Sequence, residues 1–338
     1  MNKGRRWRDA TCAVFLAAAL ALGVRAQAPP LELKLATQTV AGTAQYDGAA
    51  RFAELVGKKT QGRLSVKVYG DGALGGDLQV ISSLQRGTVD MALMNAGLLQ
   101  GVAKEFTILD FPYLFRSEDE AYAVLDGPMG QRLLELLPAQ GIVGLSFPEL
   151  GFRHIHNSKR AVERIEDLRG LKIRAIQTPI YVDTLNALEA NAVPLPFPDL
   201  YHALERKVVD GATDPLVTIA VLKFDQVQPF LTLTGHGYNP QIFLVSKSVF
   251  DKLGAGDRTA LREAAVEARD FERRISRERN AQALDQLKKT MHVSELSPVE
   301  DARMREAVKP VVDKYSKVVG GTFVAEFRTE LTRVRGKK

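Results

Sequence analysis

Residues 31–69 read LELKLATQTVAGTAQYDGAARFAELVGKKTQGRLSVKVY and decide the fold class. Residues 31–37 alternate apolar and polar side chains as a half-buried strand does, and residues 44–58 carry apolar side chains at helical spacing. LSVKVY at 64–69 gives a second strand pattern. A strand, a helix and a strand in succession form the unit from which parallel sheets are built. We therefore predict an α/β protein with a largely parallel sheet.

The alternation continues along the chain and then restarts near residue 152. A buried strand at 88–94, a helix near 118–137 and a strand at 142–147 complete a first unit. The second unit has strand patterns at 152–157, 171–176, 191–196 and 208–213, and helix patterns at 178–189 and 198–206. LQRGTVDMA at 84–92 is echoed by LERKVVDGA at 204–212, which predicts two similarly wound lobes.

The remaining segments are expected to join these lobes. Residues 230–246 read as two strands broken by Gly235, Gly237 and Pro240, and residues 257–289 as a helix of roughly 50 Å that spans both lobes. The predicted division assigns residues 27–151 and 240–279 to lobe I, and residues 152–239 and 280–338, with the C-terminal helices, to lobe II.

The net charge of +6 points at first to an acidic macromolecular partner. Residues 1–26 have a basic head, an apolar run and a small-residue site, which predict a secretory signal peptide and an exported protein. This segment carries +4 of the charge, and the tail from Arg333 carries four more basic residues. Residues 27–332 are therefore close to neutral, and no nucleic-acid partner is expected. Arg5 and Arg6 leave Sec and twin-arginine export both open.

Several enzyme classes lack support in the sequence. The single cysteine, Cys12, lies in the predicted leader, so the mature chain would have no thiol nucleophile or disulfide. Gly70, Gly72 and Gly75 fit GxGxxG but follow the second strand, so we interpret them as a loop at a cleft rim rather than a nucleotide site. His154 and His156 would share a strand face but have no third ligand nearby. No metal, cofactor or catalytic residue is predicted.

Two arginines have a more informative position. Arg174 lies in the strand pattern LKIRAI just before a loop, and Arg153 lies at the entry to the second lobe. Ligands of open α/β sheets bind beyond the carboxyl ends of the strands, where a guanidinium fork suits a carboxylate. The alternative is an interior arginine paired with Asp183 or Glu149.

Residues 151–215, from GFRHIHN to VVDGATDP, closely resemble the solute-binding proteins of TRAP transporters, the DctP family. DFPYLF at 110–115, LTGHGY at 233–238 and SKSVFDKL at 246–253 also resemble that family, and the likeness runs from about 31 to 330. The resemblance implies a two-lobed periplasmic binding protein of type II-like architecture, with hinge strands and a long bracing helix. It further implies a receptor that closes on an organic acid and delivers it to the small and large subunits of a membrane permease.

The resemblance also implies ligand-binding residues. Arg174 corresponds to the main carboxylate-binding arginine, Arg153 to a second arginine, Phe197 to a packing aromatic and His236 to a pocket residue of some members. Weaker candidates, by position, are Gln177, Tyr238, Thr37, Gln38 and Asn95.

Asp214 departs from the family, in which many members have Asn before the Pro. An ionised Asp only accepts hydrogen bonds, so it disfavours a second ligand carboxylate. We expect a hydroxy- or amino-substituted monocarboxylate, with Asp214 contacting its donor group, a cation or the helix that begins near Pro215. A sensor in place of a permease, and a periplasmic enzyme on the same scaffold, are the alternatives. The expected state is a monomer or weak dimer.

Overall fold

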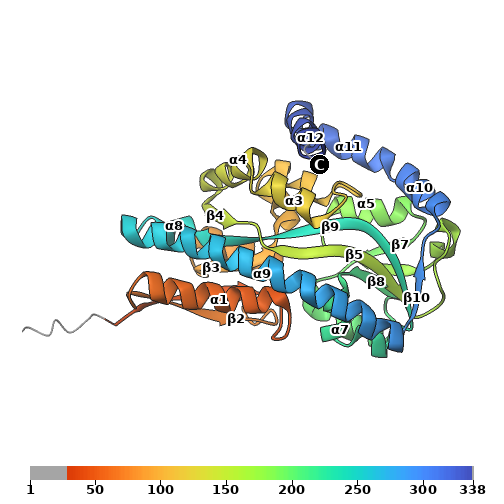
Figure 1. The fold of residues 1–338 in the computed structure, drawn as a ribbon, viewed down its shortest axis with the longest axis horizontal. Helices are drawn as coiled ribbons and strands as arrows, with labels where there is room; N and C mark the ends of the chain where they lie inside the picture. The colour runs from red at the N-terminus through yellow and green to blue at the C-terminus, as the bar shows by residue number, and fades with distance from the viewer. Residues whose placement is uncertain (1–28, 337–338) are drawn as a thin grey trace, which may run out of the picture.

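The computed structural model describes residues 29–336 and has two α/β lobes joined by long shared elements (Figure 1). The predicted signal peptide lies outside these residues. The strands are β1 (Leu31–Thr37), β2 (Leu64–Tyr69), β3 (Met91–Asn95), β4 (Ile142–Ser146), β5 (Glu149–Asn157), β6 (Lys172–Ala175), β7 (Asn191–Pro194), β8 (Gly211–Asp214), β9 (Phe230–Ser246) and β10 (His292–Glu295). The helices are α1 (Ala44–Lys59), α2 (Asp77–Arg86), α3 (Glu118–Leu125), α4 (Pro128–Leu136), α5 (Pro179–Ala187), α6 (Leu200–Glu205), α7 (Leu216–Val221), α8 (Lys247–Phe250), α9 (Ala255–Thr290), α10 (Pro298–Ala307), α11 (Lys309–Val319) and α12 (Gly321–Arg335).

The strands follow the order β2-β1-β3-β9-β5-β8-β6-β7, with β4 and β10 also paired to β9. Lobe I contains β1 to β4 and the end of β9, and lobe II contains β5 to β8, β10 and the start of β9. The outer pairs are parallel, as predicted, but β9 runs antiparallel to β3, β4 and β5. The sheet is therefore mixed rather than largely parallel, because the connecting strands cross it in the opposite direction.

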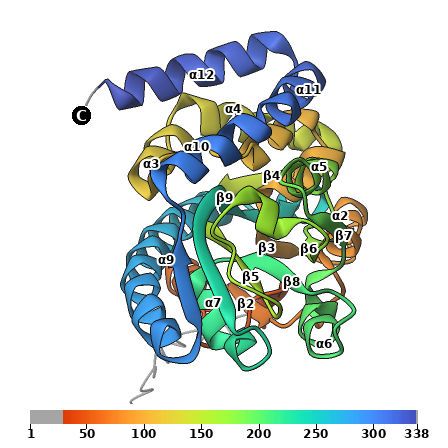
Figure 2. The same cartoon turned by 90° about the vertical axis from the view of Figure 1, so that its right-hand side faces the viewer.

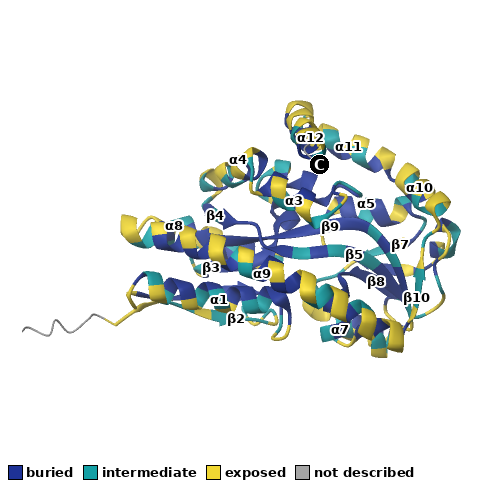
Figure 3. Cartoon of the chain, in the orientation of Figure 1, coloured by how far each residue is buried: buried dark blue, intermediate teal, exposed yellow. Residues whose placement is uncertain are grey.

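Strand β9 is one continuous strand of 17 residues, which corrects the prediction of two strands. It is buried along most of its length (Figure 3). Between Arg153 and Ile155 of β5, its partners jump from Gly237 to Thr232, so residues 233–236, with Gly235 among them, form a bulge within the strand. The expected helix near 118–137 is likewise two helices, because Gly127 and Pro128 interrupt it.

Helix α9 has 36 residues and packs on α1 and β4 of lobe I and on α7 of lobe II, which confirms the long connecting helix (Figure 1). The helices pack so closely that position 48 of α1 favours glycine, because a Cβ on Gly48 would lie 2.8 Å from the Glu272 side chain of α9. Arg279 of α9 pairs with Asp47 of α1 at 2.6 Å. The helix therefore braces both lobes along one side of the sheet.

The C-terminal helices are not confined to lobe II, to which the sequence-based prediction assigns them. Helix α10 meets lobe II through the ion pair of Arg303 and Glu166, whereas α12 packs on α3 of lobe I (Figure 2). Arg335 of α12 pairs with Glu120 of α3 at 2.6 Å. Within residues 29–336, no helix is long and apolar enough to cross a bilayer.

Candidate functional site

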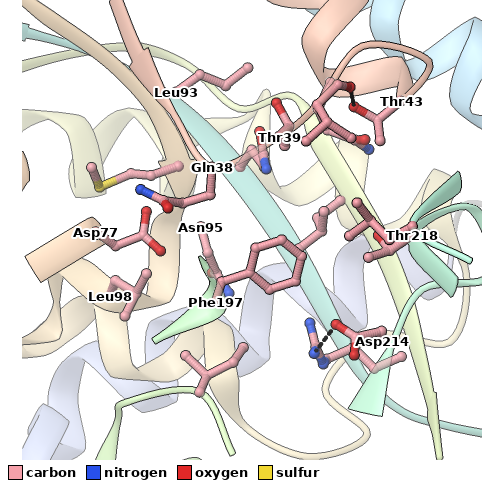
Figure 4. Close-up of a pocket in the computed structure, with 18 of the residues that line it drawn as sticks. Gln38, Thr39, Thr43, Asp77, Leu93, Asn95, Leu98, Phe197, Asp214 and Thr218 are labelled. Atoms are coloured by element: carbon pink, nitrogen blue, oxygen red, sulfur yellow. Dashed lines mark hydrogen bonds and ion pairs between the residues drawn. The ribbon is translucent and has the colours of Figure 1, made fainter. Parts of the chain in front are cut away.

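A cavity of about 70 Å³ lies between the lobes, at the ends of strands from both (Figure 4). Lobe I contributes Gln38 and Thr39 after β1, Asp77 at the start of α2, Asn95 at the end of β3, and Leu98. Lobe II contributes Arg153, Arg174, Phe197, Asp214 and Thr218. The arrangement follows from the chain direction, since the parallel strands β1 and β3 of lobe I and β6 and β8 of lobe II end beside the cavity.

Arg174 presents its guanidinium to this cavity from β6. Its side chain is buried, with the residue 4% exposed, and its Nε donates to the Leu195 carbonyl at 3.0 Å. The guanidinium carbon lies 5.8 Å from the centre of the Phe197 ring. Among the described residues, Nη1 and Nη2 have no hydrogen-bond partner, so four N–H groups remain for a ligand. Burial, together with the like charge of Arg153, lowers the pKa of Arg174 to about 10.

Arg153, by contrast, donates one hydrogen bond to the protein from each of its three guanidinium nitrogens. Its Nε donates to Thr213 Oγ1, its Nη1 to Asn239 Oδ1 and its Nη2 to Asp214 Oδ1, each at 3.0 Å. The residue is 2% exposed. Most of its hydrogen-bonding capacity is therefore used to orient it, and its charge is balanced by the Asp214 carboxylate.

Asp214 has both oxygens engaged. Oδ1 accepts from Arg153 (Figure 4). Oδ2 lies 3.1 Å from His156 Nε2. Burial alone would raise its pKa, but Arg153 and the hydrogen bond from His156 hold the pKa of Asp214 below its ordinary value. Asp214 makes no capping hydrogen bond to α7, whose N-cap is Pro215. The alternative pairings proposed for the arginines are also absent, since Asp183 pairs with Lys314 and Glu149 binds Tyr122.

Behind Arg153, a buried network continues into lobe I. Asn239 Nδ2 donates to Tyr181 Oη at 2.6 Å and approaches Asp110 Oδ1 at 3.4 Å. Asp110 ends the segment that follows β3, and burial raises its pKa to about 7 despite the opposing charge of Arg153. This network supports the Arg153 guanidinium from behind the cavity.

The lobe I wall is polar but largely unbonded. Gln38 Oε1, Asn95 Nδ2 and Gln241 Oε1 are buried and have no hydrogen-bond partner among the described residues. Asp77 lies beside them, half-buried, and burial raises the pKa of its carboxyl to about 6 against the opposing charge of Arg174. Buried polar atoms without partners are rare in folded proteins, so these groups indicate a ligand-facing surface.

Six of the ten residues named from the sequence line the cavity, namely Arg174, Arg153, Asp214, Phe197, Asn95 and Gln38. Of the other four, Gln177 is exposed, and Thr37 is buried against Thr39. Tyr238 donates to Glu149 at 3.3 Å, and His236 binds Thr234 at 2.7 Å within the β9 bulge. Burial, followed by the charge of Arg153, lowers the pKa of His236 to about 3.

The sequence reasoning missed Asp77, Asn239 and Asp110 as parts of the site. Asp77 had a usable signal, because it follows the glycine loop already interpreted as a cleft rim. Gly72 of that loop does lie at the rim, where an added Cβ would be 2.9 Å from Pro198 of lobe II. His154 accepts from the Gly235 amide, and no cluster of three or more metal-ligating side chains exists within residues 29–336.

Comparisons with known proteins agree with this architecture. Residues 35–318 match the family model of bacterial extracellular solute-binding proteins, family 7. A TRAP periplasmic solute-binding protein from Ochrobactrum anthropi is 47% identical, with a TM-score of 0.82 over 91% of this chain and 97% of that one. The sugar acid binding protein from Advenella mimigardefordensis, in complex with galactonate, is 37% identical, with a TM-score of 0.88 over 90% and 99% of the chains.

A third relative has a different ligand in its name. The C4-dicarboxylate-binding periplasmic protein DctP of Rhodobacter capsulatus is 34% identical over 91% of this chain and 93% of its own length. The matches extend over both lobes and the long helix that joins them. The chain therefore belongs to family 7 of the bacterial extracellular solute-binding proteins, the periplasmic receptors through which TRAP transporters take up small organic acids.

Proposed function

We propose that this chain captures a hydroxy- or amino-substituted monocarboxylate in the interlobe cavity and delivers it to a TRAP permease. The observation that carries the proposal is the Arg174 guanidinium, which is buried, faces the cavity and has two nitrogens without a hydrogen-bond partner in the described part of the chain. A bidentate carboxylate would satisfy both nitrogens, and each charge-assisted hydrogen bond contributes about 1.5–3 kcal/mol.

A second carboxylate finds little support in the cavity. The charged lining residues of the described chain are Arg153, Arg174, Asp77 and Asp214, which balance to zero. Arg153 is already paired with Asp214, so only Arg174 offers an uncompensated cation. Relatives of comparable identity bind galactonate or C4-dicarboxylates, so the charges of the cavity, rather than overall similarity, favour a monoacid.

Transport follows from closure of the lobes rather than from a chemical reaction. Both lobes line the cavity, so a ligand contacts both only when they are together, and its differential contacts favour that closed form. The closed surface is what the permease subunits would recognise after the signal peptide had directed the chain to the periplasm.

Calorimetric titration with a panel of organic acids tests the anchor. Arg174→Ala should weaken binding of the best monocarboxylate at least about 100-fold, because both guanidinium bonds are lost. The thermal midpoint of the ligand-free protein should barely change, since only one hydrogen bond to a carbonyl disappears. Arg51→Ala, at a half-buried residue of α1 that pairs with Glu54 and does not line the cavity, is the matched control and should bind normally. Retained affinity in Arg174→Ala would contradict the assignment.

A further inference from the structure

Each lobe contributes one charged side chain to the cavity that is not ion-paired with another lining residue. Arg153 and Asp214 neutralise each other within lobe II, which leaves Arg174 on lobe II and Asp77 on lobe I. Arg174 and Asp77 form no direct ion pair, although the charge of Arg174 acts on the Asp77 carboxyl. A ligand in the cavity therefore meets a cation from lobe II and a carboxylate from lobe I.

The neighbours of Asp77 indicate which groups of the ligand would fit the lobe I wall. Within residues 29–336, Gln38 Oε1 and Gln241 Oε1 are buried acceptors without partners, and Asn95 Nδ2 is a buried donor without one. Gln38 is fixed by its other amide atom, since Nε2 donates to the Gly75 carbonyl at 2.9 Å. Figure 4 shows Asp77, Gln38 and Asn95 on the same side of the cavity.

Hydroxyl groups match this mixed set better than other substituents. A hydroxyl donates to a carboxylate or an amide oxygen and accepts from an amide nitrogen, whereas an ammonium group only donates. A second carboxylate only accepts, and like charges in a low-dielectric site repel each other strongly.

We propose that Asp77 is the specificity-determining residue that selects polyhydroxylated monocarboxylates and rejects the corresponding dicarboxylates. This inference rests on the proposed function, because it assumes that Arg174 holds the ligand carboxylate. Asp77 accepts hydrogen bonds from hydroxyls at the far end of the ligand, and repels a carboxylate placed there.

The test uses two pairs of acids that differ only at one terminal carbon, a CH2OH group in one and a carboxylate in the other. Galactonate is compared with galactarate, and erythronate with meso-tartrate, by titration calorimetry. The wild type should bind the better monoacid at least tenfold more tightly than its diacid. In Asp77→Asn the monoacid should weaken about tenfold while the diacid binds equally or more tightly, so that the preference is lost or reversed.

Asp71→Asn is the matched control. Asp71 is an exposed residue of the same rim loop, and its loss changes the net charge equally without altering the cavity lining. This variant should keep the preference of the wild type. Asp77→Asn should also keep the thermal midpoint of the ligand-free protein, which separates a specificity effect from misfolding.

The outcomes distinguish the two proposals. If the wild type binds a monoacid through Arg174 but Asp77→Asn leaves the monoacid-to-diacid ratio unchanged, the role of Asp77 is wrong and the proposed function stands. If the wild type prefers the diacids, or binds none of the four acids, the selection assigned to Asp77 is overturned. If the wild type binds none of the acids in the wider panel used for the Arg174 test, the proposed function is overturned as well.

Discussion

The two walls of the cavity differ in how far their polar side chains are hydrogen-bonded to the protein. In lobe II, Arg153, Asp214 and His156 are bonded to one another before any ligand is considered. In lobe I, the side-chain amides of Gln38 and Asn95 each leave one buried atom without a partner among residues 29–336. A wall whose groups satisfy one another holds its geometry, whereas a wall with unsatisfied groups gains hydrogen bonds only with a ligand. Lobe II therefore provides a fixed anchor, and lobe I provides the contacts that depend on ligand identity.

The largest effect is expected from replacing Asp214, because its carboxylate bonds to both Arg153 and His156 in lobe II. Asp214→Ala leaves the Arg153 guanidinium buried without its counter-charge, and His156 Nε2 without its partner. Breaking a buried ion pair on one side costs about 3–5 kcal/mol, and urea denaturation should show a loss of this size in the free energy of unfolding. Asp199→Ala, at an exposed residue of the same lobe, should change stability little. A loss below about 1 kcal/mol would mean that the network is not prearranged.

A second test asks whether lobe I supports that network through Asp110. Burial raises the pKa of Asp110 in the folded protein to about 7, above the value of 3.8 expected when unfolded. Between these values the folded state binds the extra proton, so this carboxyl stabilises the fold at low pH and loses that contribution as pH rises through about 7. Asp110→Asn cannot titrate. Between pH 5 and pH 8 the wild type should therefore lose about 3 kcal/mol more unfolding free energy than the variant. Parallel stability curves for the two proteins would contradict the raised pKa.

The same contrast explains what the sequence could predict. Arg174 could be found because its strand pattern, 171–176, ends two residues later, and the ends of parallel strands define the binding edge. The positions of β1, β2 and α9 followed from their periodicities, since each pattern is long and local.

The partners of Arg153 and Asp214 could not be found in this way. Arg153 binds Asn239, which lies 86 positions along the chain, and Asp214 binds His156, which lies 58 positions away. These pairings depend on which strands become neighbours and in what register. His236 is the clearest case, because the β9 bulge inserts three extra residues opposite β5. An odd insertion reverses the alternation of side chains. The period of two therefore could not predict on which face of the sheet the His236 side chain lies.

The smallest expected effect concerns the place where the two walls meet. Gly72 of the lobe I rim has a φ of 65°, and an added Cβ would lie 2.7 Å from Gln38 Oε1 and 2.9 Å from Pro198 of lobe II. Gly72→Ala should therefore hold the lobes apart and weaken ligand binding about tenfold by calorimetry, with a larger radius of gyration in solution scattering when ligand is present. Gly62 has a φ of 78° but no atom within 4 Å of an added Cβ, so Gly62→Ala imposes the same backbone strain without the contact. Both variants should lose about 1 kcal/mol of stability, as a left-handed residue with a side chain does, but only Gly72→Ala should lose affinity. Equal affinities in the two variants would mean that closure does not bring this rim against Pro198, and that the lobe I wall reaches the ligand by another movement.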